Sequence, residues 1–170
     1  MSVADTSKMV YFKNENECFN LRCASVCVRK DEVLLFYFDK EKGDFWTLQG
    51  GRCNMYETTS DAIIREFKEE IGEKISIIRL LWVIENFFEF KGTNFHELLF
   101  VYLAELNTDS EVIKTDEFFA HEGERSMLCR WVKIKDLGKY KILPNIFYSL
   151  LSNIPNETQH IVHHDKNITI

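Results

Sequence analysis

One amphipathic helix, predicted between Glu57 and Gly72, constrains this chain more than any other segment. Thr58 is a favourable N-cap residue, and Asp61 follows three residues later as an acceptable capping-box partner. Gly72 suits the position just past the helix end, where the backbone often turns left-handed. With about 100° between successive residues, the apolar side chains gather on one arc, which we expect to pack against a core. They are Ile63, Ile64, Phe67 and Ile71.

Three carboxylates lie on the neighbouring arc of the same helix. With Glu66 taken as zero, Glu69 lies at about −60° and Glu70 at about +40° around the axis. Like charges at this spacing destabilise an isolated helix by a few tenths of a kcal/mol. A solvated acidic face tolerates that cost, and three glutamates alone favour this structural interpretation.

Two further features favour a cation site over a solvated face. Arg65 lies four residues before Glu69, where its guanidinium can orient that carboxylate. The pair Gly50–Gly51 follows a strand-like segment, residues 45–48, and glycines allow backbone carbonyls to approach a ligand closely. Oxygen ligands of this kind suit Mg²⁺ or Mn²⁺ rather than zinc. The segment therefore predicts a hard divalent cation, and a polyphosphate is the substrate that suits such an ion.

The segment resembles the signature of the Nudix hydrolases, G-x5-E-x7-R-E-U-x-E-E-x-G-U, in which U is a bulky apolar residue. Phe67 is aromatic where the family usually has an aliphatic residue, and Glu73 replaces an apolar one. Neither departure touches the predicted metal ligands. The fixed positions that match in register are Gly51, Glu57, Arg65, Glu66, Glu69, Glu70 and Gly72.

The resemblance implies an α/β/α sandwich around a mixed β-sheet. It also implies hydrolysis of a nucleoside diphosphate linked to another moiety, in which a metal-bound water attacks one phosphorus of the pyrophosphate. Glu66, Glu69 and Glu70 are then expected to hold the metal, and the Gly51 carbonyl to add a ligand. Glu57 is a further candidate, either as a water-mediated contact or as a stabiliser of the helix start.

The resemblance leaves the general base open, while Arg65 is expected to orient carboxylates rather than to touch substrate. In some relatives the base is a glutamate of the signature, here Glu66, and in others it is a carboxylate outside it. Glu97, beside His96 in a largely apolar stretch, is the best outside candidate. The alternative is that Glu97 simply faces solvent at a strand start. Weaker candidates in a polar stretch are Glu117, Glu122 and Glu124.

Composition and charge bound the class of protein. A length of 170 residues suits one domain, which we expect to span residues 1–170 with a core of about 18–152. The net charge of −6 argues against a nucleic-acid binder, and no apolar run reaches the ~18 residues of a membrane helix. We expect a soluble cytoplasmic protein with a small-molecule nucleotide substrate, and a homodimer is left open. The five cysteines, an odd number without an export signal, are expected to be reduced thiols.

Hydrophobic patterns predict a mixed order of strands and helices. Residues 23–29 and 32–38 are expected to form a hairpin, residues 74–90 and 95–105 two paired strands, and residues 129–134 another strand. Pro144 marks the start of a closing helix. Residues 107–126 are expected to be a polar connection, and residues 1–17 and 153–170 to be edge strands or extensions of low order.

The sequence leaves the substrate itself open. Some Nudix subfamilies carry a proline 15 residues after the last signature glycine, where this chain has Phe87, or a tyrosine slightly further on, where it has Phe88, Glu89 and Phe90. Two other functions stay open at this point. A catalytically silent binding or regulatory module of this fold is disfavoured by the intact carboxylate set. An RNA-end processing enzyme is disfavoured by the acidic charge balance.

Overall fold

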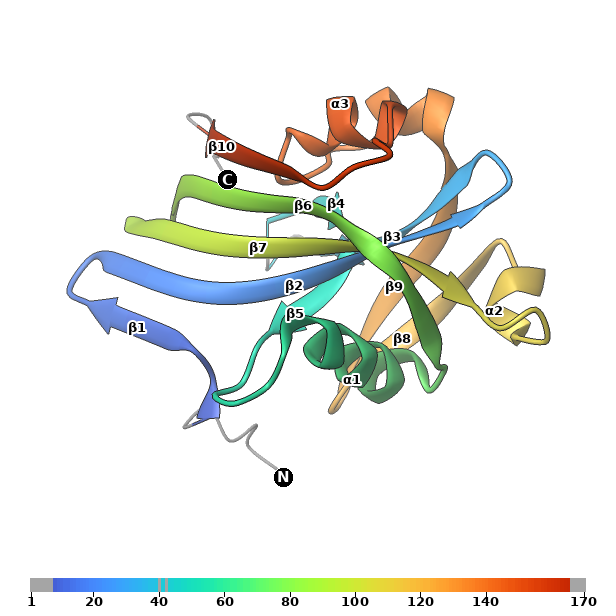
Figure 1. Cartoon of the computed structure of the whole chain (residues 1–170), viewed down its shortest axis with the longest axis horizontal. Helices are drawn as coiled ribbons and strands as arrows, with labels where there is room; N and C mark the ends of the chain where they lie inside the picture. Colours follow the sequence, from blue (N-terminus) through green and yellow to red (C-terminus); the bar gives the residue numbers. More distant parts are fainter. Residues whose placement is uncertain (1–7, 40, 42, 166–170) are drawn as a thin grey trace.

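The computed structural model describes residues 8–39, 41 and 43–165, and the strands of this part join into one mixed β-sheet (Figure 1). The strand order is β10-β6-β7-β2-β3-β9-β8, with β1 and β5 paired to β2 and with β4 paired to β3. The strands are β1 (Tyr11–Asn14), β2 (Glu17–Arg29), β3 (Glu32–Phe38), β4 (Phe45–Thr47), β5 (Gln49–Arg52), β6 (Ile75–Phe90), β7 (Thr93–Leu106), β8 (Glu117–Glu122), β9 (Arg125–Lys133) and β10 (Gln159–Asp165). The helices are α1 (Thr59–Ile71), α2 (Glu111–Lys114) and α3 (Phe147–Ser152), with a 3₁₀ helix over Ile134–Lys139.

Strand β2 positions the rest of the sheet because it has partners along both edges. One edge pairs in parallel with β7, which brings Asn20 opposite Glu97. The other edge pairs antiparallel with β5, which brings Cys23 opposite Gly51. Strand β7 pairs antiparallel with β6, and β6 pairs in parallel with β10. The glycine loop and Glu97 therefore lie on two strands that flank β2.

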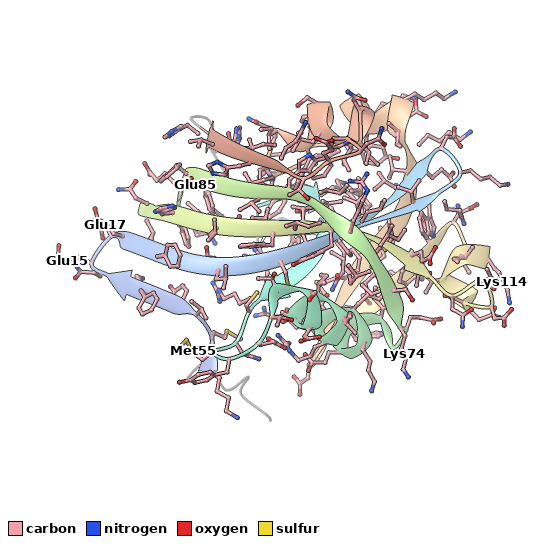
Figure 2. All side chains as sticks on the ribbon, viewed as in Figure 1. Glu15, Glu17, Met55, Lys74, Glu85 and Lys114 are labelled. Carbon is pink, nitrogen blue, oxygen red and sulfur yellow. The ribbon has the colours of Figure 1, made fainter. Side chains whose placement is uncertain are left out.

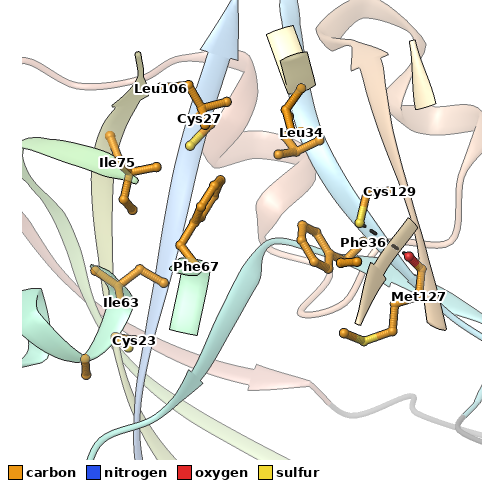
Figure 3. Packing of buried hydrophobic residues seen from close by; sticks show 14 of the residues in the cluster. Cys23, Cys27, Leu34, Phe36, Ile63, Phe67, Ile75, Leu106, Met127 and Cys129 are labelled. Atoms are coloured by element: carbon orange, nitrogen blue, oxygen red, sulfur yellow. Dashed lines mark hydrogen bonds between the residues drawn. The ribbon is translucent and has the colours of Figure 1, made fainter. Parts of the chain in front are cut away.

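Buried side chains form one apolar cluster on each face of the sheet. Helix α1 packs on one face through Ile63 and Phe67 (Figure 3). Helix α3 lies on the other side of the sheet in Figure 1, and its Phe147 joins the second cluster. Neighbouring residues of β2 divide between the two, Cys23 in the first and Ala24 in the second, because side chains alternate along a strand. This is the expected α/β/α sandwich.

The ends of α1 follow from the residues that the sequence places there. Thr58 is extended, with φ −71° and ψ 150°, and its hydroxyl accepts from the Asp61 N–H at 3.1 Å and donates to the Asp61 carboxylate at 2.6 Å. Gly72 has φ 80°, a left-handed conformation, and its N–H donates to the Lys68 carbonyl at 3.0 Å. Both predicted helix ends are confirmed.

Most predicted elements are confirmed, but the polar connection over residues 107–126 is wrong. That stretch contains α2 and β8, and Val112 and Ala120 are buried in the cluster under α1. Because charged residues occupy exposed positions of β8, the alternation of polar and apolar residues that is typical of a strand is hard to see in the sequence. At the chain ends, β1 and β10 are edge strands, as one of the two alternatives predicted, whereas residues 1–7 and 166–170 lie outside the described part.

Two predictions from composition can be compared with this structure. All five cysteines are buried and free, and Cys23 and Cys27 lie in the apolar cluster under α1. Over the described ranges, no helix combines the length and the apolar character needed to cross a membrane.

Phe67→Ala tests whether α1 is held mainly by its apolar arc. Phe67 is fully buried, so the variant is expected to lose about 3–5 kcal/mol of unfolding free energy through lost burial and the cavity left behind. Lys68→Ala, at the exposed neighbouring position, is the matched control and should change stability by less than about 0.5 kcal/mol. Urea unfolding of both variants measures this, and equal stabilities would contradict the packing described.

Candidate active site

Two glycines of β5 allow close approaches, Gly51 that of α1 and Gly50 that of β2. A Cβ at Gly51 would lie 2.1 Å from Cδ of Glu66, and a Cβ at Gly50 would lie 2.2 Å from the Cys23 carbonyl oxygen of β2. Neither distance is compatible with a side chain. Gly51 therefore leaves the space that the Glu66 carboxylate fills, and Gly50 leaves the space that the β2 backbone fills.

The Arg65 guanidinium donates hydrogen bonds to three glutamates. Its Nε donates to Glu57 Oε1 at 2.7 Å and its Nη2 to Glu57 Oε2 at 3.0 Å. Its Nη1 donates to Glu66 Oε1 at 2.7 Å and to Glu69 Oε2 at 3.1 Å, and Nη2 also reaches the Arg52 carbonyl at 3.2 Å. Because these acceptors occupy its donors, Arg65 holds the carboxylates in place.

The Glu57 carboxylate accepts hydrogen bonds from both Arg65 and the Asn54 N–H, and in this it differs from the other carboxylates of the signature. Arg65 holds the pKa of Glu57 below its usual range, and the Asn54 N–H donates to Glu57 Oε2 at 3.0 Å. Glu57 is therefore ionised and stays at the start of α1, where a negative charge also suits the helix dipole.

Glu66 and Glu70 are poorly solvated. Burial raises the pKa of Glu66, against the opposing effect of Arg65. Burial also raises the pKa of Glu70 to about 7, and the nearby negative charges of Glu66 and Glu122 add to that shift. Gln49 Nε2 donates to Glu70 Oε2 at 3.1 Å and partly offsets it. These two carboxyl groups would gain stability from a nearby cation.

Glu97 lies on the sheet face opposite α1, where Arg22 links it to the glycine loop. Glu97 is only 5% exposed, so the alternative that it faces solvent is wrong. Asn86 Nδ2 donates to Glu97 Oε1 at 3.3 Å, and Arg22 Nη1 lies 3.8 Å from Glu97 Oε2. Arg22 Nη2 donates to the Gly50 carbonyl at 3.5 Å. Its positive charge also acts on Glu66 and Glu70, so Arg22 is near both groups of carboxylates.

The structure thus brings together the predicted residues of the signature and adds three that sequence reasoning missed, namely Arg22, Gln49 and Asn86. The donors around α1 are oxygen atoms, which fit Mg²⁺ or Mn²⁺ in kind. In the described part of the chain, no three His, Cys, Asp or Glu side chains converge as they stand on one metal position. Arg65 keeps Glu66 and Glu69 directed toward its guanidinium, so coordination requires carboxylate rotation.

Among the weaker carboxylate candidates, Glu122 lies beside the main cluster. Glu117 and Glu122 belong to β8 rather than to a loop, and Glu117 pairs with Arg130 at 2.8 Å. Glu122 lies near enough to Glu70 to raise its pKa, whereas Glu124 is exposed in the turn before β9. In Figure 2, Met55 and Lys74 mark the two ends of the segment that carries the main cluster.

Comparisons with known proteins agree with this geometry. A family model described as the NUDIX domain matches residues 20–151. Diphosphoinositol polyphosphate phosphohydrolase 2 of Mus musculus and of Homo sapiens are each 30% identical to this chain over 128 residues. The alignment covers 74% of this chain and 64% of either relative, so the chain spans less than two thirds of their length.

Solved structures show the same fold at low sequence identity. A NUDIX hydrolase from Nitrosomonas europaea has a TM-score of 0.62 at 16% identity, covering 87% of this chain and 79% of that one. An ADP-ribose pyrophosphatase from Streptococcus suis has a TM-score of 0.57 at 15% identity, covering 84% and 98%. Because the family model matches most of the sequence, and the signature residues meet where α1 contacts the glycine loop, the chain belongs to the NUDIX family.

Proposed function

We propose that this protein is a metal-dependent hydrolase that cleaves the pyrophosphate linkage of a nucleoside diphosphate joined to another moiety. The observation that carries the proposal is the carboxylate face of α1, held by Arg65 against the Gly50–Gly51 loop. The name of the curated relatives, diphosphoinositol polyphosphate phosphohydrolase 2, supports a diphosphate-bearing substrate. The intact carboxylate set favours this reaction over a silent binding module.

We assign Mg²⁺ or Mn²⁺ to the carboxylates of Glu66, Glu69 and Glu70, with a glycine carbonyl as a further donor. The Gly51 carbonyl accepts from the buried Cys23 thiol at 3.6 Å, whereas the Gly50 carbonyl lies beside the partly exposed Arg22. A guanidinium that donates to the Gly50 carbonyl would repel a cation at that oxygen, so the Gly51 carbonyl that the sequence suggested stays the proposed donor. When bound, such an ion lowers the pKa of a water molecule and neutralises charge on phosphate oxygens.

The chain's own residues position these groups. Arg65 sets the orientation of Glu66 and Glu69, and Gln49 sets that of Glu70. Glu57 holds the far side of the Arg65 guanidinium, so its role is positioning rather than direct coordination. Glu97 as the general base stays a prediction. The Arg22 guanidinium contacts both Glu97 and the Gly50 carbonyl, so one side chain bridges Glu97 and the glycine loop.

A substrate screen tests the function directly. Nucleoside diphosphate derivatives with Mg²⁺ or Mn²⁺ should release nucleoside monophosphate or phosphate, and chelation should abolish release. Glu69→Gln should weaken cation binding in calorimetry and lower turnover by at least about 100-fold, because it removes an anionic donor. Glu157→Gln, at an exposed position between α3 and β10, is the control. Unchanged cation affinity in Glu69→Gln would remove the assignment, and a protein that hydrolyses no anhydride would favour the binding module.

The raised pKa of Glu70 predicts a pH dependence of stability. The pKa of about 7 in the folded protein lies above the ordinary glutamate value of about 4.5, so the folded protein binds this proton more tightly than the unfolded chain does. With EDTA present, the unfolding free energy should therefore fall by roughly 1–3 kcal/mol as the pH rises from about 4.5 to above 7. Glu70→Gln should lose most of this fall while its activity drops. Urea unfolding at several pH values measures the unfolding free energy of the wild type and of Glu70→Gln. If that free energy varied with pH in the same way in both proteins, the raised pKa of Glu70 would be contradicted.

Glu97→Gln tests the general base. Turnover is expected to fall by at least about 100-fold, because a base contributes typically that much, while KM and cation affinity stay within about twofold. Raising the pH should partly restore turnover, since hydroxide needs no base. Steady-state kinetics across pH, with calorimetry for the cation, measures these quantities. A loss of cation affinity would make Glu97 a ligand, and turnover within twofold of wild type would exclude both roles.

A further inference from the structure

Two hydrogen bonds of the Gln49 side chain join strand β2 to the last turn of α1. Ser25 Oγ donates to Gln49 Oε1 at 3.3 Å, and Gln49 Nε2 donates to Glu70 Oε2 at 3.1 Å. Ser25 and Gln49 lie opposite each other in the register of β2 and β5, and they are 2% and 1% exposed. Buried polar groups of this kind depend on one another for hydrogen bonds. We call this pair of contacts the Gln49 bridge.

The Ser25 hydroxyl decides which end of the Gln49 amide faces α1. An amide accepts at its oxygen and donates only at its nitrogen. With Ser25 at the oxygen, the nitrogen is directed toward the Glu70 carboxylate, which can only accept when it is ionised. Because Gln49 is fully buried, its side chain is also confined by packing. The bridge therefore places a neutral donor on Glu70 before any ion binds.

Glu70 is held differently from the other two proposed metal ligands. Arg65 donates to Glu66 at 2.7 Å and to Glu69 at 3.1 Å, so these two carboxylates must turn away from a positive charge before they bind a cation. Glu70 accepts from a neutral amide instead, which fixes the carboxylate and adds no charge that competes with the ion. Glu70 is therefore the carboxylate whose position in the free protein bears most directly on the choice of ion.

The bridge leaves Glu70 with its two oxygens in unlike states. Oε2 carries the Gln49 hydrogen bond, so Oε1 is the oxygen that an ion can use without breaking a contact of the bridge. Mg²⁺ takes about six ligands in a nearly ideal octahedron, whereas Ca²⁺ takes about six to eight and often uses both oxygens of one carboxylate. To bind both oxygens of Glu70, Ca²⁺ would have to displace the amide. Mg²⁺, which needs only one of them, would not.

We propose that Gln49, oriented by Ser25, is a cation-selectivity residue that favours Mg²⁺ relative to Ca²⁺ by holding Glu70 to coordination through one oxygen. This inference rests on the proposed function, because it assumes that the cation binds at Glu66, Glu69 and Glu70. Gln49 acts through Glu70 and touches neither the ion nor the substrate, so it is a positioning residue. It adds a choice between hard cations that the carboxylates alone do not make.

Calorimetry on Gln49→Leu tests the selectivity without turnover. The variant removes both contacts of the bridge and keeps an apolar side chain of similar size in a buried place. Protein freed of metal is titrated with Mg²⁺ alone and with Ca²⁺ alone, and the binding heat that Glu70→Gln abolishes is assigned to this site. Mg²⁺ should bind about tenfold more weakly, as expected for a lost hydrogen bond to a charged group, whereas Ca²⁺ should bind within about twofold of wild type or more tightly.

The ratio of the Ca²⁺ to the Mg²⁺ dissociation constant is the deciding quantity, and it should fall about tenfold in Gln49→Leu. Loss of the amide also changes how readily Glu70 takes up a proton, but a proton opposes both cations alike and cancels in the ratio. The matched control is Gln159→Leu, the same substitution at an exposed position of β10, which should leave the ratio unchanged.

Ser25→Ala is a second variant that keeps Gln49 and removes only the contact that orients its amide. It should shift the ratio in the same direction by about threefold, because the amide then holds Glu70 less firmly. Thermal unfolding in EDTA checks both variants, and Ser25→Ala carries the test if Gln49→Leu unfolds early. An unchanged ratio in the folded variants would overturn the inference, and so would equal losses for the two cations, which would make the bridge purely structural.

The same titrations separate this inference from the proposed function. Wild-type protein that binds neither cation, or that binds both as well after Glu69→Gln, would reject the proposed metal site and the hydrolase with it. Wild-type protein that loses cation binding in Glu69→Gln but keeps its ratio in Gln49→Leu would leave the hydrolase standing and reject only the selectivity assigned to Gln49.

Discussion

The contact between the Glu66 carboxylate and the Cα of Gly51 is the constraint on which the site depends. A Cβ at that position would overlap the carboxylate, so only glycine allows α1 to approach β5 this closely. Arg65 then closes the arrangement by binding Glu57 before the helix, Glu66 and Glu69 on it, and the Arg52 carbonyl at the end of β5. Loop, strand and helix therefore form one unit, and moving any part would disturb the carboxylate positions.

The charges in this unit are unbalanced, which supports the proposed divalent cation. Arg65 neutralises only part of the charge of the glutamates around it, and Glu66 and Glu70 are buried enough for their pKa values to rise. A polyphosphate brought to such a surface would be repelled. A hard divalent ion removes both difficulties, since it stabilises the carboxylates and attracts phosphate oxygens. The same carboxylates that cost stability in the free protein are thus the groups that the proposed function needs.

Strand β2 presents different side chains to the two faces of the sheet. On the side of α1, the Cys23 thiol donates to the Gly51 carbonyl, and on the opposite side Asn20 pairs in register with Glu97 and Arg22 lies 3.8 Å from it. Arg22 lies at the boundary, because its guanidinium contacts both the Gly50 carbonyl and Glu97.

The sequence by itself determined the features that depend on neighbouring residues. The caps at Thr58 and Gly72, the apolar arc, and the contact of Arg65 with Glu69 all follow from helical periodicity, which converts spacing directly into geometry. The hairpin of β2 and β3 follows equally from local pattern. Strand β8 escaped notice because its exposed charged residues outnumber the buried positions that reveal a strand.

Only the tertiary structure decided which distant segments meet. The burial of Glu97, the contact of Gln49 with Glu70, and the place of Arg22 between two carboxylate groups depend on strands far apart in the chain. Alternation shows that a strand has two faces, but it does not show which strand becomes its neighbour or in which register they pair. The parallel pairings of β2 with β7 and of β6 with β10 set that register, and they align His163, Asn86, Glu97 and Asn20 in one row.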